Sequence, residues 1–128
     1  MTREQAETAA ITRLGLFSVT AYTTDQVSAE DFAFPDTYAE VRVAPTSRGL
    51  PKGSATSLVG GWQLEVEIVG RLAVNVNRYL DRCHAAFYGH RLVVGSSLST
   101  PMQEGPSDSP DKTGDDRFTA FSEWTFAL

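Results

Sequence analysis

Two neighbouring stretches carry the clearest pattern of hydrophobic and polar positions in the chain. In WQLEVEIV, which begins at Trp62, apolar and polar residues alternate, so a strand with one apolar and one polar face is expected. From Leu72 to Phe87 apolar residues recur every three or four positions, which predicts an amphipathic helix, and Gly89 is suited to end it in a left-handed conformation. The apolar stripe of the helix should cover the apolar face of the strand.

The first part of the chain predicts another helix and another strand. Thr2 and Gln5 have the spacing of a capping box, so a helix should begin there and end near residues 15–17. Residues 38–43 alternate again, which predicts a strand, and the Thr- and Tyr-rich stretch 20–27 could form a short one. The first helix is expected to pack on the same sheet as the second.

The chain closes on an aromatic stretch, FTAFSEWTFAL, over residues 118–128. Its large apolar side chains share one parity, which predicts a final paired strand, and residues 91–94 are expected to form a further strand. The predicted core residues are Trp62, Leu64, Val66, Ile68, Leu80, Phe87 and Trp124.

One long segment, residues 44–60, separates the strand at 38–43 from the strand at Trp62. It is longer than a hairpin needs, rich in Gly, Ser and Pro, and locally basic at Arg48 and Lys52. Two interpretations remain open. The segment is either a tolerated, disordered insertion or a contact arm that becomes ordered against a partner or a neighbouring subunit.

A second long segment, residues 96–117, contains three prolines that argue against regular strand pairing. Its acidic candidates for partner contact are Glu104, Asp108, Asp111, Asp115 and Asp116. The run DSPDKTGDD does not fit an EF-hand, because Pro110 and Lys112 occupy the wrong places. A solvated acidic loop is therefore favoured over a calcium site.

These elements predict a single α+β domain spanning residues 1–128. Its sheet should be mostly antiparallel, with about four to five strands, and two helices should cover one face. The two long loops, about 44–60 and 96–117, should project from it. A chain of 128 residues with 41% hydrophobic residues can bury a substantial core.

Charge and cysteine content narrow the range of partners. Eleven basic and sixteen acidic residues give a formal charge of −5, which argues against a general nucleic-acid-binding surface. The single cysteine, Cys83, lies on the apolar helix stripe and is expected to act as a small buried hydrophobic residue. No signal-peptide pattern and no apolar run long enough to span a bilayer is present, so we expect an intracellular protein without a membrane partner.

No motif for catalysis or for cofactor or metal binding is present in the sequence. His84 and Cys83 are consecutive on a helix and point about 100° apart, so they cannot form a catalytic pair. An enzyme using His84 or His90 with a nearby carboxylate is the weakest alternative, and a monomeric module that binds a ligand or peptide is a stronger one. We expect no cofactor, no metal and no enzymatic activity.

A small sheet domain with projecting loops is suited to assembly into a ring or filament. The order of elements resembles that of the tail terminator, or tail completion, proteins of long-tailed bacteriophages and gene transfer agents. The resemblance spans nearly the whole chain: an N-terminal helix, Phe34-Pro35 before a strand, a long loop, the Trp62 strand, a second helix and an Asp-rich segment before Trp124.

The resemblance implies a structural virion protein that forms a ring of six subunits on the tail tube, ends tube polymerisation and presents the surface that joins the head. It implies tail tube protein and a head–tail connector as partners, assembly in the host bacterial cytoplasm, and DNA passing through the ring without specific binding. The loop around Arg48 and Lys52 would correspond to a connection directed toward the tube or a neighbour, and Asp108 to Asp116 to an acidic approach to the last strand. Another position in the phage neck is the alternative.

Overall fold

The computed structural model describes residues 2–46, 61–113 and 116–127. Its helices and strands, in chain order, are α1 (Arg3–Gly15), β1 (Ala21–Thr23), α2 (Thr24–Val27), β2 (Thr37–Pro45), β3 (Gly61–Gly70), α4 (Ala73–Phe87), β4 (Val93–Val94), β5 (Ser97–Leu98), β6 (Gln103–Ser107), β7 (Asp111–Lys112) and β8 (Phe118–Ala127). The α+β class is confirmed.

Within the described residues, one six-stranded sheet carries the fold. The strand order is β1-β2-β3-β8-β6, and β7 pairs with a further part of β8. Every pairing in it is antiparallel except that of β1 with β2. At the centre, Ile68 of β3 lies between Ala39 of β2 and Ala120 of β8. The expectation of a mostly antiparallel sheet is confirmed, and the extra strands come from β6 and β7.

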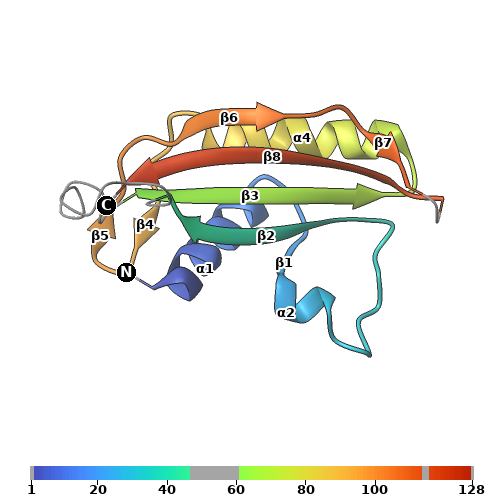
Figure 1. The fold of residues 1–128 in the computed structure, drawn as a ribbon, viewed down its shortest axis with the longest axis horizontal. Helices are drawn as coiled ribbons and strands as arrows, with labels where there is room; N and C mark the ends of the chain where they lie inside the picture. Colours follow the sequence, from blue (N-terminus) through green and yellow to red (C-terminus); the bar gives the residue numbers. More distant parts are fainter. Residues whose placement is uncertain (1, 47–60, 114–115, 128) are drawn as a thin grey trace.

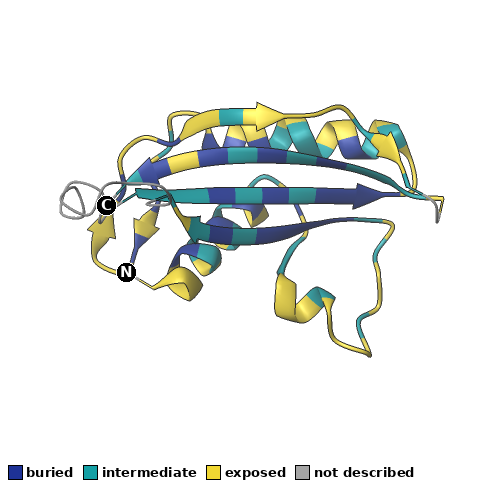
Figure 2. Ribbon diagram, in the orientation of Figure 1, coloured by how far each residue is buried: buried dark blue, intermediate teal, exposed yellow. Residues whose placement is uncertain are grey.

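The two longer helices cover one face of this sheet, with α1 over β2 and α4 over β3 and β8 (Figure 1). The even-numbered side chains of β3 point into the layer between sheet and helices, which is why buried and half-buried positions alternate along the strand in Figure 2. Of the predicted core residues, the fully buried ones are Leu64, Val66, Ile68, Phe87 and Trp124. Trp62 and Leu80 are only half-buried and pack at the margin.

Local signals set the helix ends. The Thr2 side chain accepts a hydrogen bond from the Gln5 backbone N–H, and Gln5 accepts one from the Thr2 N–H, so the predicted capping box is confirmed. Gly89 follows α4 with φ +69°, as predicted for the residue that ends it. At its other end α4 is capped poorly: Leu72 occupies the N-cap position and makes no side-chain cap bond. A Ser, Thr, Asp or Asn cap would stabilise such a helix by about 1 kcal/mol.

Two of the weaker strand expectations change in the structure. Residues 20–27 form the short strand β1 and then turn into the four-residue helix α2, which Thr23 and Gln26 cap. Residues 91–94 contribute only β4, which pairs with β5 in a separate two-stranded hairpin and not with the main sheet. The chain reverses directly after Val94 because Gly95 adopts φ +61°, so β4 pairs with the residues that follow it.

The prediction of a long loop over residues 96–117 is wrong in part, because β5, β6 and β7 lie within it. Proline does not prevent pairing here: β6, which contains Pro106, is an edge strand, and its register on β8 shifts between Glu104 and Ser107. Edge strands tolerate a missing N–H and such irregularities. Of the loop predicted over 44–60, residues 44 and 45 belong to β2, and residues 47–60 lie outside the described residues.

Candidate functional site

The predicted contact residues do not form one described cluster. Arg48, Lys52 and Asp115 lie outside the described residues. The others engage separate local partners: Glu104 reaches His84 of α4 at 3.2 Å, Asp108 accepts the backbone N–H of Phe121 at 2.8 Å, and Asp116 pairs with Lys112 at 3.6 Å. Asp111 is exposed in β7. No group of three or more metal-binding side chains occurs in the described part of the chain.

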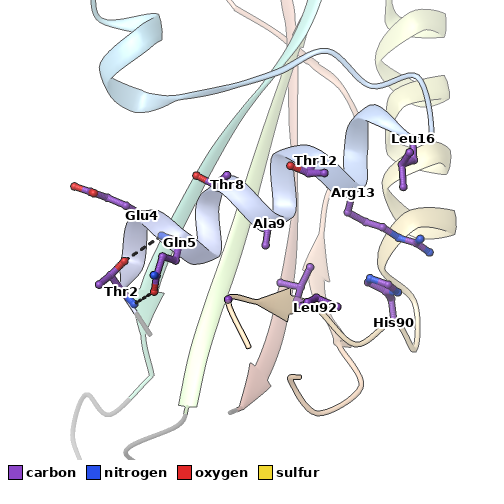
Figure 3. A pocket seen from close by; sticks show the side chains of 12 residues that line it. Thr2, Glu4, Gln5, Thr8, Ala9, Thr12, Arg13, Leu16, His90 and Leu92 are labelled. Carbon is purple, nitrogen blue, oxygen red and sulfur yellow. Dashed lines mark hydrogen bonds between the residues drawn. The ribbon is translucent and has the colours of Figure 1, made fainter. Parts of the chain in front are cut away.

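A groove lies between α1 and the β4–β5 hairpin, and we call it the α1 groove (Figure 3). It encloses about 740 Å³. Ala9 of α1 and Leu16, the residue that caps its C-terminal end, line one side, and Leu92 and Val93 line the other from the segment after α4. Leu16 is 73% exposed and Val93 is 63% exposed, although apolar residues of this size are usually buried. The groove therefore presents an uncovered apolar surface.

Backbone hydrogen bonds fix the wall opposite α1. Beyond Gly89, the Met102 N–H donates to the His90 carbonyl at 2.8 Å, which ties the segment after α4 to the start of the β6 region. The buried Ser99 hydroxyl accepts the Leu92 N–H at 2.8 Å, and the Ser99 N–H donates back to Leu92 at 2.9 Å. These bonds hold Leu92 against the core and position the hairpin beside α1.

Arg13 and His90 are the basic groups of the α1 groove. Arg13 donates through Nε to the Ala86 carbonyl at 2.8 Å, and its guanidinium lies 4.7 Å from the centre of the Phe17 ring. Partial burial lowers the pKa of His90, and the charge of Arg13 lowers it further. The neutral imidazole is thus favoured at neutral pH, and Arg13 is held against α4 instead of extending freely into the groove.

The face of the sheet opposite the helices carries an acidic network around Arg42. The Arg42 guanidinium contacts Glu40 at 2.7 Å, forms an ion pair with Glu65 and lies 4.0 Å from Glu67. Burial alone would lower the pKa of Arg42, but the Glu65 bond and charge, followed by Glu40 and Glu67, raise it. Three carboxylates against one guanidinium leave a net charge of −2. This open face would repel phosphate.

Apart from His90, which was named only as part of the weakest catalytic alternative, neither surface was singled out from the sequence. Alternation placed Glu65 and Glu67 on a polar face, but their grouping with Arg42 depends on the β2–β3 register, which sets Arg42 opposite Glu65. The α1 groove depends on the β4–β5 hairpin, which no periodic pattern of apolar residues predicts. A usable signal was Gly95 between the apolar run 92–94 and Leu98, because Val93 and Leu98 pair across that hairpin.

The described elements define an α+β domain in which two helices cover one face of a mostly antiparallel sheet and the other face stays open. The fold is similar to that of a chain in the virion of a native gene transfer agent particle, with a TM-score of 0.65, 12% sequence identity, and coverage of 96% of this chain and 92% of that chain. A second solved structure matches with a TM-score of 0.59, 15% identity, and coverage of 99% and 95%.

No protein-family model and no curated protein matches the sequence. At identities this low, the two structural likenesses establish a shared fold. In the described part of the chain, no helix has both the length and the apolar character of a bilayer span.

Proposed function

We propose that the protein is a structural component of a phage-like virion and acts as a ring-forming tail terminator. The observation that carries this proposal is the likeness to a chain of a gene transfer agent virion over almost the full length of both chains. The order of elements, with an N-terminal helix and an aromatic closing strand, supports the finer assignment to the tail end. The protein has a structural role and not an enzymatic one.

In this role, six copies associate by a repeated heterologous contact, which closes into a ring when the rotation between neighbours allows it. The ring sits on the last ring of tail tube protein, ends its polymerisation and offers its outer surface to a head–tail connector. The protein resides in the neck of the virion. The particle is assembled in the host cytoplasm, and the protein joins it there.

DNA passes through such a ring without being bound. The net charge of −5 and the carboxylates around Arg42 favour a surface that repels the DNA backbone. Acidic residues lining the channel would keep phosphate groups from adhering to the wall. The basic loop residues Arg48 and Lys52 are proposed to contact the tube or a neighbouring subunit.

Electron microscopy of the purified protein, alone and mixed with isolated tail tubes, tests this proposal. We expect six-fold rings at one end of each tube, and tubes that no longer lengthen when tube protein is added. An unrelated acidic protein of similar size serves as control. A protein that leaves tube ends bare and tube growth unchanged would contradict the tail-terminator function.

A second candidate function follows from the α1 groove. Its volume of about 740 Å³ lies within the range of pockets that hold small ligands. A monomeric module that binds a ligand or peptide would use this groove without assembling. Sedimentation separates the two functions, because a module stays monomeric at concentrations at which a ring-forming protein associates.

A further inference from the structure

Two uncovered apolar surfaces lie toward opposite ends of the domain. The β4–β5 hairpin, which forms one wall of the α1 groove, lies at the end where β8 finishes, whereas α4 begins near the end where β3 finishes (Figure 1). At that second end, Leu72 is 56% exposed and Val74 is 52% exposed. We call these two residues the α4 knob.

The α4 knob breaks a local rule of helix stability. Leu72 occupies the N-cap of α4, where a short polar side chain would bond a free backbone N–H, and it makes no such bond. More than half of its surface is also exposed, so the core covers only part of this side chain. A position that breaks a local rule in this way is a candidate functional position.

The α1 groove offers a matching apolar surface. Leu16 and Val93 are exposed at its walls, and Leu98, which pairs with Val93 across the hairpin, extends the apolar surface and is 57% exposed. Exposed apolar side chains gathered in this way mark interaction sites more often than isolated ones do. The groove volume of about 740 Å³ is several times that of a leucine side chain, so it has room for the end of a helix.

The α1 groove contains Glu4 as well as Arg13 and His90, and of these only Glu4 is exposed, with a charge opposite to that of Arg78 beside the α4 knob. Arg78 is exposed one turn after Val74, and the first turn of α4 contains no acidic residue. Glu4 is exposed at the α1 groove. Neither Arg78 nor Glu4 forms an ion pair within the described residues. A partner with a basic group beside an apolar helix end fits the groove, and this chain itself carries one.

We infer that the α1 groove of one copy receives the α4 knob of a second copy. Leu72 enters the groove between α1 and the β4–β5 hairpin, and Val74 contacts its rim. Since the two surfaces differ and lie toward opposite ends, the contact is heterologous, and every bound copy leaves one groove and one knob free for the next. This inference rests on the proposed function, because the inferred contact is the one that would build the proposed ring.

Substitutions at Leu72 separate assembly from folding. Leu72→Asn adds a capping side chain and removes the apolar one without changing the charge, whereas Leu72→Met keeps an apolar residue. At concentrations at which the protein is monomeric, Leu72→Asn should unfold about 4 °C higher than wild type because of the new cap. Its self-association, measured by sedimentation velocity, should be at least about tenfold weaker. Leu72→Met should associate within about threefold of wild type.

A mixing experiment tests whether the contact is heterologous. The knob variant carries Leu72→Asn and Val74→Asn, and the groove variant carries Leu16→Gln and Val93→Thr. Each should be monomeric alone, because each lacks one half of every contact. Mixed in equal amounts they should form dimers and nothing larger, since one intact knob meets one intact groove and both outer ends are inactive. Recovery of no complex, or of large assemblies, would overturn the inference.

The same variants distinguish this inference from the proposed function. If wild-type protein caps tail tubes and Leu72→Asn caps them equally well in micrographs, the contact is wrong while the tail-terminator function stands. If the two variants complement each other as dimers but wild-type protein ignores tube ends, the contact stands and the function is wrong. Circular dichroism of every variant must match that of wild type, which these exposed positions should allow.

Discussion

The two faces of the central sheet show how one set of strands serves two purposes. On the helix-covered face, Leu64, Val66 and Ile68 of β3 are fully buried. On the open face, the intervening Glu65 and Glu67 are half-exposed and share Arg42 of the neighbouring strand. The covered face is held by apolar burial, which is not screened by salt as charge pairs are, whereas the open face depends on the balance of a few charges.

The largest test of this comparison is Trp124→Ala on the covered face. Trp124 is fully buried, and its indole N–H donates to the buried Ser122 hydroxyl at 2.8 Å. We expect a loss of about 3 to 5 kcal/mol of unfolding free energy in a urea titration. Trp62→Ala is the matched control, because Trp62 is only half-buried and should lose no more than about 2 kcal/mol. Equal losses would contradict the described burial.

The next test uses the thiol on the covered face. Burial raises the pKa of Cys83 to about 12, so the folded state disfavours the thiolate. Above pH 9 the unfolded chain releases this proton while the folded chain keeps it. Stability is therefore retained below pH 9 and should fall, by up to about 1.4 kcal/mol per pH unit, as the pH rises toward 12. Cys83→Ala should remove this part of the slope in urea titrations.

The same burial predicts slow chemistry at Cys83. A disulfide reagent at pH 8 should react with the native protein only through unfolding, so the rate should rise with urea in proportion to the unfolded fraction. A thiol that reacts in native protein as fast as in a peptide would show that α4 does not cover this position.

A smaller effect is expected on the open face from Arg42→Met. The substitution leaves the nearly buried Glu40 with only the Thr24 hydroxyl, at 2.8 Å, as a described partner and removes the cation between three carboxylates. Because Arg42 and Glu65 are about one third exposed, the expected loss is about 1 to 2 kcal/mol. A double-mutant cycle with Glu40→Gln should show coupling between the two residues. Additive losses would mean that the network contributes little.

The smallest effect is expected from Glu67→Gln. Glu67 lies 4.0 Å from Arg42. The substitution removes one negative charge from a cluster that has an excess of negative charge. The unfolding free energy of the Glu67→Gln variant should stay within about 0.5 kcal/mol of that of wild type. A loss as large as that of Arg42→Met would show that the third carboxylate is an essential partner, which its distance does not suggest.

Much of the fold could be predicted because its signals are local. The capping box at Thr2, the alternation after Trp62 and the stop at Gly89 each lie within a few residues, and each has a direct structural effect. Strand pairing is not local. That β6 pairs with β8 in spite of Pro106 depends on its position at the sheet edge, which no residue within β6 reveals.

The candidate surfaces were harder to predict than the core for the same reason. The α1 groove combines α1 with a hairpin more than seventy residues later in the chain. The exposed Leu72 lay on the stripe predicted to cover the sheet, and only its position at the helix end excludes it from the core. Among the charged residues singled out from the sequence, those with a described local partner are Glu104, Asp108 and Asp116.

The edges of the sheet restrict how copies of this protein can join. At one edge β1 spans three residues, and at the other β6 carries a proline and an interrupted register. Within the ranges that the structure describes, neither edge offers a long, regular row of free amide and carbonyl groups to a strand from another chain. Fibril growth by pairing of edge strands is thereby disfavoured. An oligomer of this protein would then grow only through side-chain contacts and would stop when no side-chain surface remains free. For the proposed ring, which would need a fixed number of copies, that restraint is an advantage.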